Sequence, residues 1–163
     1  MIEIVPADSD KRIEQIKLLF TEYAAIRNYD AALGNFQAEL ESLPGKYAPP
    51  AGSLLLALYE QQVAGCIAYQ PLETGVCEMK RMFVSPVFRG KGIGTSLIKR
   101  LVEIAVIAGY HTMRLDTHPW MFSAHKLYQA EGFYEIARYN QNPTPGIRFY
   151  EKIMGGSSTA PDP

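Results

Sequence analysis

The chain has 163 residues, of which 47% are hydrophobic and 20% are charged, so it holds enough apolar material for the core of one globular domain. Its net charge of −1 at pH 7 gives no electrostatic footprint for nucleic acid or an anionic membrane. No apolar run approaches the roughly 18 residues of a membrane span, and the first residues form a strand pattern instead of a signal peptide. We therefore expect a cytoplasmic protein with neither nucleic-acid nor membrane partners.

The first part of the chain predicts a strand, two helices and a second strand. Residues 2–5 form a short apolar strand, and residues 8–10 supply N-cap candidates for a helix that runs to about Arg27. One apolar stripe at helical spacing follows this helix, formed by Ile13, Ile16, Leu19, Phe20 and Tyr23. A weaker helix is expected at residues 36–43. Residues 53–59 are a continuous apolar run of strand length, which indicates a strand covered on both faces.

The rest of the chain predicts elements in the order strand, strand, helix, strand, helix, strand, strand. Their expected ranges are 63–69, 78–84, 92–108, 111–117, 121–130, 133–137 and 147–153. Gly109 stands where a glycine is expected just past a helix C-terminus. The pattern describes an α/β (α+β) protein with one domain over residues 1–154. Residues 155–163 are small, polar or proline, and a disordered tail is expected there.

Two cysteines, Cys66 and Cys77, lie in predicted strands. They are too few and unsuitably spaced for a zinc site, and no metal is expected. We interpret them as reduced, small hydrophobic residues. A catalytic thiol is the alternative, which would need a nearby base and a lowered pKa.

The loop Arg89-Gly90-Lys91-Gly92-Ile93-Gly94 joins a predicted strand to a predicted helix. The N–H groups in the first turn of a helix lack intrahelical partners, and glycines there let an anion approach the backbone. Arg89 and Lys91 add positive charge, which favours a phosphate. The alternative is a turn that only connects two elements. The spacing fits neither the dinucleotide fingerprint, which would need glycine at Thr95 or Leu97, nor the Walker loop.

The loop resembles the pyrophosphate-binding loop of the GNAT superfamily of acyl-CoA-dependent N-acetyltransferases, whose pattern is Arg/Gln-x-x-Gly-x-Gly/Ala. Arg89, Gly92 and Gly94 match this pattern. Val84-Ser85-Pro86 is similar to the family's lead-in to the loop. Ala124-His125-Lys126-Leu127-Tyr128, followed by Glu131-Gly132-Phe133, is similar to a later family motif. These stretches cover roughly residues 76–136, and elsewhere the resemblance lies in the order of elements.

The resemblance implies a mixed, mainly antiparallel central sheet of about six to seven strands flanked by about four helices. It implies acetyl-CoA as acyl donor, held between the strands that end at Val84 and Thr117, and no metal. The implied reaction is direct attack by a primary amine of a small molecule or peptide on the acetyl group. The implied cofactor-binding residues are Met82, Phe83, Val84, Arg89, Gly90, Lys91, Gly92, Ile93, Gly94 and Thr95.

Such a reaction requires removal of the amine proton, stabilisation of the carbonyl oxygen and protonation of the thiolate. By resemblance, a backbone N–H of residues 82–84 stabilises the oxygen. Glu78 then lies deeper in the cleft as the candidate base, acting directly or through water. The alternative is an exposed glutamate paired with a neighbouring cation. Strand alternation predicts one face with Glu78, Lys80, Met82 and Val84, and the other with Met79, Arg81 and Phe83.

Tyr128 matches the tyrosine that protonates the departing sulfur in the family motif. The alternative is an aromatic residue that only packs on the sheet. His118 is an alternative base or a surface residue, and His125 is expected on the surface. The family often carries Asn three residues before the alanine of this motif, where this chain has Met121, which cannot donate a hydrogen bond.

Two rival functions are an acyl-CoA-binding regulatory domain that has lost catalysis and an interaction scaffold of the same fold. A homodimer is implied by the resemblance alone. The family binds the amine acceptor with its first two helices and last strand pair. These contribute Tyr23, Arg27, Tyr29, Tyr139 and Arg148 as candidate lining. The two arginines would suit an acceptor with a carboxylate, or they are solvated surface residues.

Overall fold

The computed structural model describes residues 1–27, 36–119 and 121–155. Within them the strands and α-helices are, in chain order, β1 (Ile2–Pro6), α1 (Asp10–Arg27), α2 (Phe36–Ser42), β2 (Ser53–Tyr59), β3 (Gln62–Glu73), β4 (Val76–Val84), α3 (Ile93–Ile107), β5 (Thr112–Thr117), α4 (Phe122–Ala130), β6 (Tyr134–Ile136) and β7 (Arg148–Ile153). Two short 3-10 helices, Gly45–Tyr47 and Pro86–Phe88, lie in the loops before β2 and α3.

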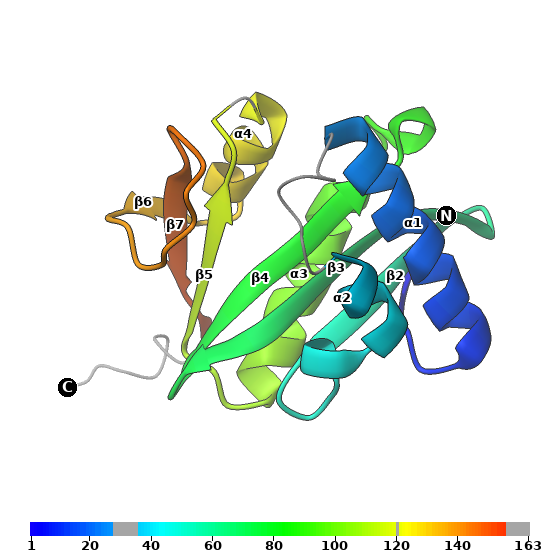
Figure 1. The fold of residues 1–163 in the computed structure, drawn as a ribbon, viewed down its shortest axis with the longest axis horizontal. Coiled ribbons are helices and arrows are strands. Elements are labelled where there is room, and N and C mark those ends of the chain that lie inside the picture. The colour runs from blue at the N-terminus through cyan, green and yellow to red at the C-terminus, as the bar shows by residue number, and fades with distance from the viewer. Residues whose placement is uncertain (28–35, 120, 156–163) are drawn as a thin grey trace.

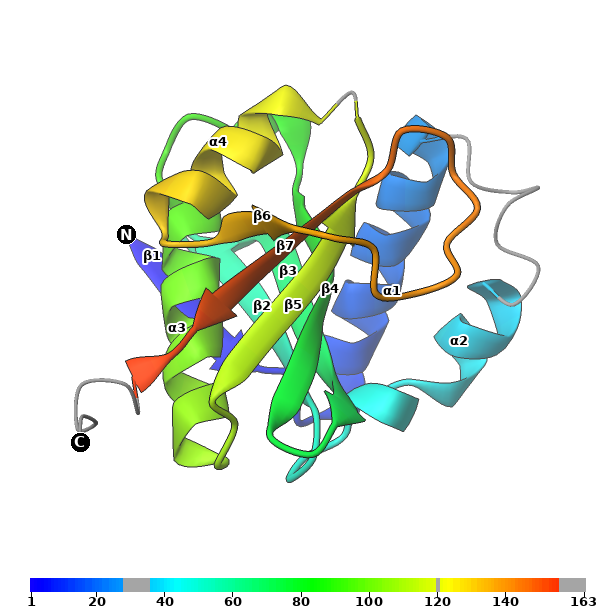
Figure 2. The ribbon, with the colours of Figure 1, turned by 90° about the vertical axis from the view of Figure 1, so that its left-hand side faces the viewer.

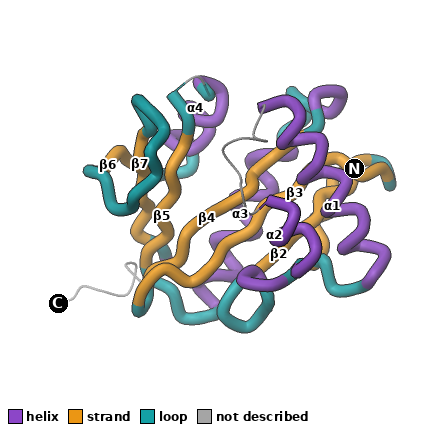
Figure 3. Tube along the Cα trace, viewed as in Figure 1, coloured by secondary structure: helices purple, strands orange, loops and turns teal. Residues whose placement is uncertain are grey.

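The strands form one seven-stranded sheet in the order β1-β2-β3-β4-β5-β7-β6. Among the described strands only β4 and β5 pair in parallel, and all other neighbours are antiparallel. Helices α1 and α2 cover one face of the sheet, and α3 and α4 lie on the other (Figures 1 and 2). The trace in Figure 3 shows the same layers, with helices on both sides of the strands. The predicted mixed, mainly antiparallel sheet with four flanking helices is confirmed.

The sheet separates two apolar clusters, one under α3 and one under α1. Strand β2 contributes to both, because Leu55 and Ala57 join the α3-side cluster while Leu54 and Leu56 join the α1-side cluster. This confirms that both faces of β2 are covered. The stripe predicted for α1 also faces the sheet, where its members pack in the α1-side cluster: Ile13, Ile16, Leu19, Phe20 and Tyr23. Burial of this apolar surface is the main contribution to folding.

The observed bounds lie close to the predicted ranges except in β3. This strand continues to Glu73 because it keeps pairing with β4, where Glu73 lies opposite Val76. Gly109 follows α3 with a positive φ of 102°, as the helix-end prediction requires. The predicted tail, residues 155–163, lies outside the described residues apart from Gly155.

A β-bulge interrupts β4 at Arg81. The pairing with β3 shifts by one residue there, so Ile67 of β3 lies opposite both Arg81 and Met82. Arg81 has a φ of +59°, in the left-handed region that a non-glycine residue adopts only at a local cost. An extra residue of this kind reverses the direction of every later side chain in the strand.

The bulge makes the predicted alternation wrong beyond residue 80. Met79 packs in the α3-side cluster before the bulge, and Met82 and Val84 pack against the same cluster after it. Glu78 and Lys80, which alternate with Met79, therefore lie on the opposite face from Met82 and Val84. The Glu78 side chain and the side chains of Met82 and Val84 thus point to different faces of the sheet.

Strands β4 and β5 pair only at their beginnings. Their parallel ladder joins Val76 to Thr112 and ends where Glu78 lies opposite Arg114. Beyond this point the two strands separate toward the end of the sheet at which α4 lies (Figure 1). Beyond Glu78, the edge of β4 that faces β5 therefore has no strand partner among the described residues. Its backbone N–H and C=O groups are available there to other groups. This divergence matches the expected splay of the strands ending at Val84 and Thr117.

Both cysteines are buried and unpaired, which supports their interpretation as small hydrophobic residues. Burial raises the pKa of the Cys77 thiol to about 12. Burial likewise raises the pKa of Cys66, whose thiol lies 3.4 Å from the carbonyl oxygen of Arg81. A raised pKa is the reverse of what a nucleophilic thiol needs, so a catalytic role has no support.

Helix α2 is joined to the bulge by a largely buried ion pair. Arg81 donates two hydrogen bonds to Glu39, from Nε at 2.9 Å and from Nη2 at 2.8 Å, and the Tyr47 hydroxyl donates a third at 3.1 Å. The two charged side chains are only 15% and 12% exposed. Burial alone would raise the pKa of Glu39, but the hydrogen bond and charge of Arg81 outweigh it, so that pKa is lowered.

Replacing Glu39 should test this connection. Glu39→Gln leaves the Arg81 guanidinium without its counter-ion, so the free energy of unfolding should fall by about 2 kcal/mol at neutral pH. Because the folded-state pKa lies below the ordinary value of 4.5, the difference from wild type should shrink as the pH falls through that folded-state pKa. Urea unfolding of both proteins at several pH values measures this.

The control is Glu41→Gln, two residues away on the exposed face of α2. It should change stability by less than about 0.5 kcal/mol. Equal stability of Glu39→Gln and wild type at neutral pH would contradict a structural role for the pair.

Candidate functional site

The loop before α3 presents three backbone N–H groups. Gly90 and Gly92 adopt φ values of +80° and +83°, which L side chains rarely adopt. Gly92 is the N-cap and supplies no side-chain hydrogen bond, and the first helical bond runs from the N–H of Ser96 to its carbonyl oxygen. The N–H groups of residues 93–95 consequently lack capping partners in the described structure. Together with the helix dipole they form an anion-binding position.

A cavity of about 530 Å³ opens against this loop. All of the predicted cofactor residues except Lys91 line it, together with Tyr23, Phe88, Met121, Phe122, Ser123, Ala124 and Leu127. The Nζ atom of Lys91 lies instead over the ring of Tyr59, 5.3 Å from its centroid. Arg89 is fixed by a hydrogen bond of 3.0 Å from Nε to the carbonyl oxygen of Val84. We call this space the loop cavity.

The three glycines of the loop serve different purposes. A Cβ atom built on Gly90 or Gly92 would meet no atom within 4 Å, so only their backbone conformation and the approach of a ligand explain them. A Cβ atom on Gly94 would lie 2.8 Å from Cδ2 of Leu127. Gly94 is therefore required for the packing of α3 against α4 as well as for the cradle of N–H groups.

A second cavity, of about 690 Å³, lies between the diverging ends of β4 and β5. We call it the cleft cavity. It shares Tyr23, Met82 and Met121 with the loop cavity. Its other lining residues are Met79, Lys80, Arg81, Leu115, Asp116, Thr117, His118, Tyr128, Asn140, Gln141, Asn142, Pro143 and Thr144. The loop cavity therefore lies next to a second cavity with a more polar lining.

Tyr128 lines the cleft cavity from α4. Its ring packs on Phe133 and Tyr150, with centroids 6.0 and 6.2 Å away, and its hydroxyl has no hydrogen bond to any described residue. Burial, followed by the charges of Tyr23 and Asp116, raises the pKa of Tyr128. The phenol is therefore neutral at physiological pH and holds a proton to donate. Met121, at the helix start, accepts a 3.7 Å hydrogen bond from the Thr117 hydroxyl through its sulfur.

Glu78 is buried beneath the cleft instead of lining it. Its side chain is 4% exposed and borders neither cavity. Oε1 accepts a hydrogen bond of 2.9 Å from Gln70, and Oε2 accepts bonds of 2.6 Å from the Tyr139 hydroxyl and 3.4 Å from Asn140. The alternative of an exposed glutamate is wrong, and direct contact with an acceptor is blocked by this enclosure.

Asp116, a residue that sequence reasoning missed, presents a carboxylate to the cleft cavity. Its Oδ2 atom accepts hydrogen bonds of 2.7 Å from Asn140 and 3.3 Å from Asn142. Its position in the sequence could have indicated this role. Asp116 stands near the carboxyl end of a strand that was expected to diverge from its parallel neighbour, and parallel sheets bind ligands at that end of their strands. The two asparagines belong to the loop between β6 and β7, and their contact with β5 could not be read from spacing.

The two histidines, His118 and His125, lie in different surroundings. His118 lines the cleft cavity, so it remains a candidate there. The prediction that His125 lies on the surface is wrong, because its side chain is only 4% exposed. It stands three residues before Tyr128 and so shares the buried face of α4. Its Nε2 atom lies 2.9 Å from the carbonyl oxygen of His118, and burial lowers its pKa.

The predicted acceptor lining is met only in part. Tyr23 borders both cavities, whereas Tyr139 is used to hold Glu78. Arg148 is exposed, lies 3.9 Å from Glu135, and borders neither cavity. Tyr29 and the side chain of Arg27 lie outside the described residues.

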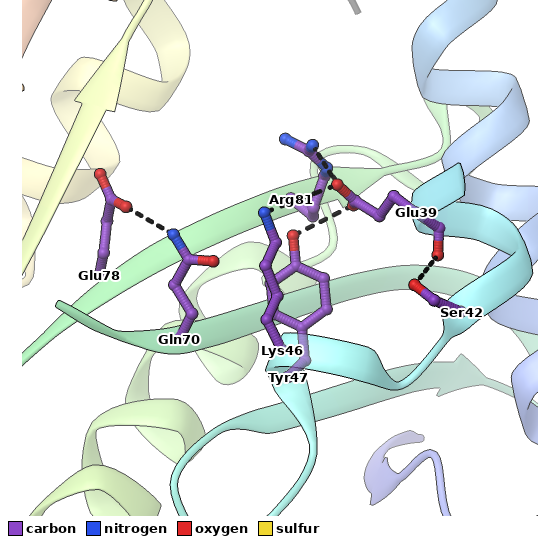
Figure 4. Close-up of polar contacts among 7 residues, drawn as sticks. All are labelled: Glu39, Ser42, Lys46, Tyr47, Gln70, Glu78 and Arg81. Carbon is purple, nitrogen blue, oxygen red and sulfur yellow. Dashed lines mark hydrogen bonds and ion pairs between the residues drawn. The ribbon is translucent and has the colours of Figure 1, made fainter. Parts of the chain in front are cut away.

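Positive charge gathers at the α2 side of the cleft cavity. Lys80 and Arg81 line the cavity, and Lys46 lies 3.8 Å from Glu39, the partner of Arg81. Figure 4 shows Lys46 between this pair and the Glu78–Gln70 contact. Burial, and then the charges of Arg81 and Lys80, lower the pKa of Lys46 against the attraction of Glu39. Arg81 and Lys46 thus share the Glu39 carboxylate, and Lys80 adds a third cation at the cavity. This excess of positive charge favours a ligand with negative charge.

None of the described helices combines the length and apolar character needed to cross a bilayer. No three His, Cys, Asp or Glu side chains come together there as a set of metal ligands.

Comparison with known proteins gives consistent matches. Residues 16–133 match the model of the acetyltransferase (GNAT) family. An uncharacterized N-acetyltransferase of Schizosaccharomyces pombe is 36% identical over 87% of this chain and 88% of its own length. The N-acetylaspartate synthetase of Danio rerio is 35% identical over 72% of this chain but only 42% of its own length. The structure of PaiA N-acetyltransferase from Thermoplasma acidophilum in complex with coenzyme A superimposes with a TM-score of 0.74, at 19% identity, over 94% of this chain and 99% of that one.

Substitution of Gly92 should test the anion-binding loop. Gly92→Val cannot keep a φ of +83° without strain, so the N–H groups at the start of α3 lose their common direction. Affinity for CoA should fall tenfold or more, about 1.4 kcal/mol. Affinity for pantetheine, which lacks the pyrophosphate, should be nearly unchanged. Calorimetric titration with both ligands measures the difference.

Gly109→Val provides the matched control. Gly109 also has a positive φ, and a Cβ atom there would meet nothing within 4 Å, but it lies at the far end of α3. This variant should carry a similar folding defect and bind CoA as the wild type does. A folded Gly92→Val protein with normal CoA affinity would remove the loop from the site.

Proposed function

The chain belongs to the acetyltransferase (GNAT) family, and on that premise we propose that it transfers an acetyl group from acetyl-CoA to a primary amine of a small molecule or peptide. One observation carries the proposal: a cavity lined by the glycine loop continues, between diverging strands, into a second cavity that holds a neutral tyrosine. The first compartment suits a pyrophosphate and its pantetheine arm. The second suits an amine.

The residues present fit acetyl-CoA, which supplies the activated acetyl group when bound. The N–H groups of residues 93–95 and the Arg89 side chain hold the pyrophosphate. The unpaired edge of β4 lies beside the pantetheine arm, and an N–H of residues 82–84 stabilises the carbonyl oxygen. Met121 cannot replace the amide hydrogen bond common in the family, so backbone contacts carry more of the binding.

Tyr128 serves as the general acid. Its hydroxyl borders the cleft cavity, is held neutral by its raised pKa, and has no hydrogen-bond partner in the described structure. A group in this state gives its proton to the departing sulfur and is not diverted to a neighbouring acceptor.

Removal of the amine proton depends on the carboxylates beneath the cleft. Glu78 acts indirectly in this proposal, because the groups that donate hydrogen bonds to its oxygens separate it from the cavity. Asn140 is the enclosing group that also lines the cavity. Glu78→Gln should therefore lower the rate without changing CoA affinity.

The acceptor we propose is a small amine that also carries a negative group. Lys80 and Arg81 line the cleft cavity, and Lys46 lies next to Glu39, the partner of Arg81. The N-acetylaspartate synthetases among the relatives are named for an anionic amino-acid product. Because this chain spans less than half of those proteins, their substrate is support for a class and not an assignment.

The first test of the proposed function is turnover. The purified protein should release free CoA from acetyl-CoA when supplied with one or more amines from a panel that includes L-aspartate, L-glutamate, β-alanine, spermidine and lysine-bearing peptides. Thiol release followed by mass measurement of the product decides the result. Tight CoA binding without turnover of any amine would favour the non-catalytic alternative.

The role of Tyr128 should be visible in kcat. Tyr128→Phe keeps the ring packed and removes only the hydroxyl, so kcat should fall by about 10²-fold with little change in CoA affinity. A donor thioester whose thiol has a lower pKa should restore much of the rate, because its thiolate leaves without a proton. Tyr134→Phe, which removes an exposed hydroxyl that is hydrogen-bonded to Glu151, should be unaffected. Equal loss with both donors would exclude the acid role.

Lys80 should contribute to recognition of a negatively charged acceptor. Lys80→Gln should raise KM about tenfold for an acceptor with a carboxylate and leave KM nearly constant for its uncharged analogue. Lys126→Gln, on the exposed face of α4, is the control and should change neither value. If Lys80→Gln raises KM for both acceptors alike, the positive side of the cleft does not recognise charge.

A further inference from the structure

Two neighbouring carboxylates, Glu78 and Asp116, lie near the cleft cavity and differ in exposure. Glu78 belongs to the last paired position of the β4–β5 ladder, whereas Asp116 lies two residues past the end of that ladder on β5. Only Asp116 lines the cavity. The side-chain nitrogen of Asn140 donates to both, at 2.7 Å to Asp116 and 3.4 Å to Glu78, so one amide bridges the pair.

The oxygens of Asp116 are not used equally. Asn140 and Asn142 both donate to Oδ2, and no described residue donates to Oδ1. Both oxygens of Glu78, in contrast, accept hydrogen bonds from protein groups. Asp116 therefore has the free acceptor position that a bound amine requires, and Glu78 does not.

The loop that holds Asp116 is itself ordered by hydrogen bonds. The side-chain oxygen of Asn140 accepts from the N–H of Asn142 at 3.0 Å, and that of Asn142 accepts from the N–H of Thr144 at 3.0 Å. The Tyr139 hydroxyl is bound to Glu78 at 2.6 Å. These contacts fix the direction in which the two asparagine amides point, and hence the orientation of the Asp116 carboxylate.

Asp116 and Tyr128 line the same compartment from opposite elements, β5 and α4. The charge of Asp116 contributes to the raised pKa of Tyr128, so the two side chains interact. An acceptor amine at Asp116 would thus lie in the compartment where the sulfur is to be protonated.

We propose that Asp116 is the carboxylate that contacts the acceptor, binding its ammonium group at Oδ1 and accepting the proton that the nitrogen loses, while Glu78 is a positioning residue that acts through Asn140. The inference rests on the proposed acetyl transfer. The bound ammonium first releases one proton to solvent, and the neutral nitrogen forms a bond to the thioester carbon. Asp116 then takes the second nitrogen proton as the carbon–sulfur bond breaks, and the sulfur takes the Tyr128 proton. Return of the Asp116 proton to the Tyr128 oxygen leaves an amide, free thiol and one released proton.

The pH dependence of this step involves every charged or titratable group around Asp116. From β4 these are Glu78, Lys80 and Arg81, from β5 and its end Arg114 and His118, from α1 Tyr23, from α4 Tyr128, and from the β6–β7 loop Tyr139. The experiment must therefore compare variants at matched pH values and not rely on one profile.

The test measures kcat/KM against pH for the wild type, Asp116→Asn and Glu78→Gln. The acceptors are the fastest amine of the panel above and hydroxylamine, which is largely uncharged at neutral pH. With the amine, Asp116→Asn should lose about 10²-fold in kcat/KM at every pH compared, and with hydroxylamine the loss should be much smaller. Glu78→Gln should lose about tenfold with both acceptors alike, as expected for a group that only positions another.

Two further variants serve as controls. Asp116→Glu keeps the charge and should recover much of the activity with the amine, even where Asp116→Asn folds poorly. Glu103→Gln, on the exposed side of α3, should behave as the wild type. Full activity of Asp116→Asn with the amine, or a larger loss in Glu78→Gln than in Asp116→Asn, would overturn the proposal and return the base role to Glu78. A wild type that binds CoA but acetylates no acceptor would instead overturn the proposed function, and this inference with it.

Discussion

The end of the parallel ladder between β4 and β5 is the constraint on which the site depends. Parallel strands share one set of hydrogen bonds, so when the pairing stops at Glu78 and Arg114 both strands expose backbone at the same level. The loop cavity and the cleft cavity meet across this opening, at Tyr23, Met82 and Met121. The opening has the unpaired backbone edge of β4 on one side, and Asp116 of β5 and Tyr128 of α4 also line it.

The two compartments recognise charge by different physical means. At the loop, backbone N–H groups and a helix N-terminus offer partial charges whose direction is fixed by glycine conformation. In the cleft the charges belong to side chains, which two separate sets of hydrogen bonds hold: one joins Arg81 to Glu39 of α2, and the other joins Glu78 and Asp116 to the loop after β6. The first arrangement suits a cofactor portion that never varies. The second depends on side chains that substitution can alter, so acceptor choice can change without loss of the fold.

Sequence reasoning found the elements and the loop because both depend on local patterns. Apolar spacing predicts helices and strands, and Arg89 to Gly94 form a contiguous motif. It failed where one residue changes the register or where distant segments meet. The bulge at Arg81 carries no glycine or proline to announce it, and the bridge from Asn140 to Asp116 spans 24 positions. His125 is buried because it shares one face of α4 with Tyr128, three residues later. Its polar side chain suggested a surface position, which the helical spacing should have overruled.

The bulge at Arg81 has a consequence for how β4 tolerates change. A substitution at this position alters one side chain and one ion pair, whereas removal of a single residue would restore regular alternation and turn Met82 and Val84 away from α3. Chain length in this strand is therefore under tighter constraint than residue identity. Related proteins that differ from this one by an insertion or deletion within β4 should show compensating length changes nearby. The side chains before and after the bulge must both keep their places on the α3 side of the sheet, as Met79, Met82 and Val84 do here.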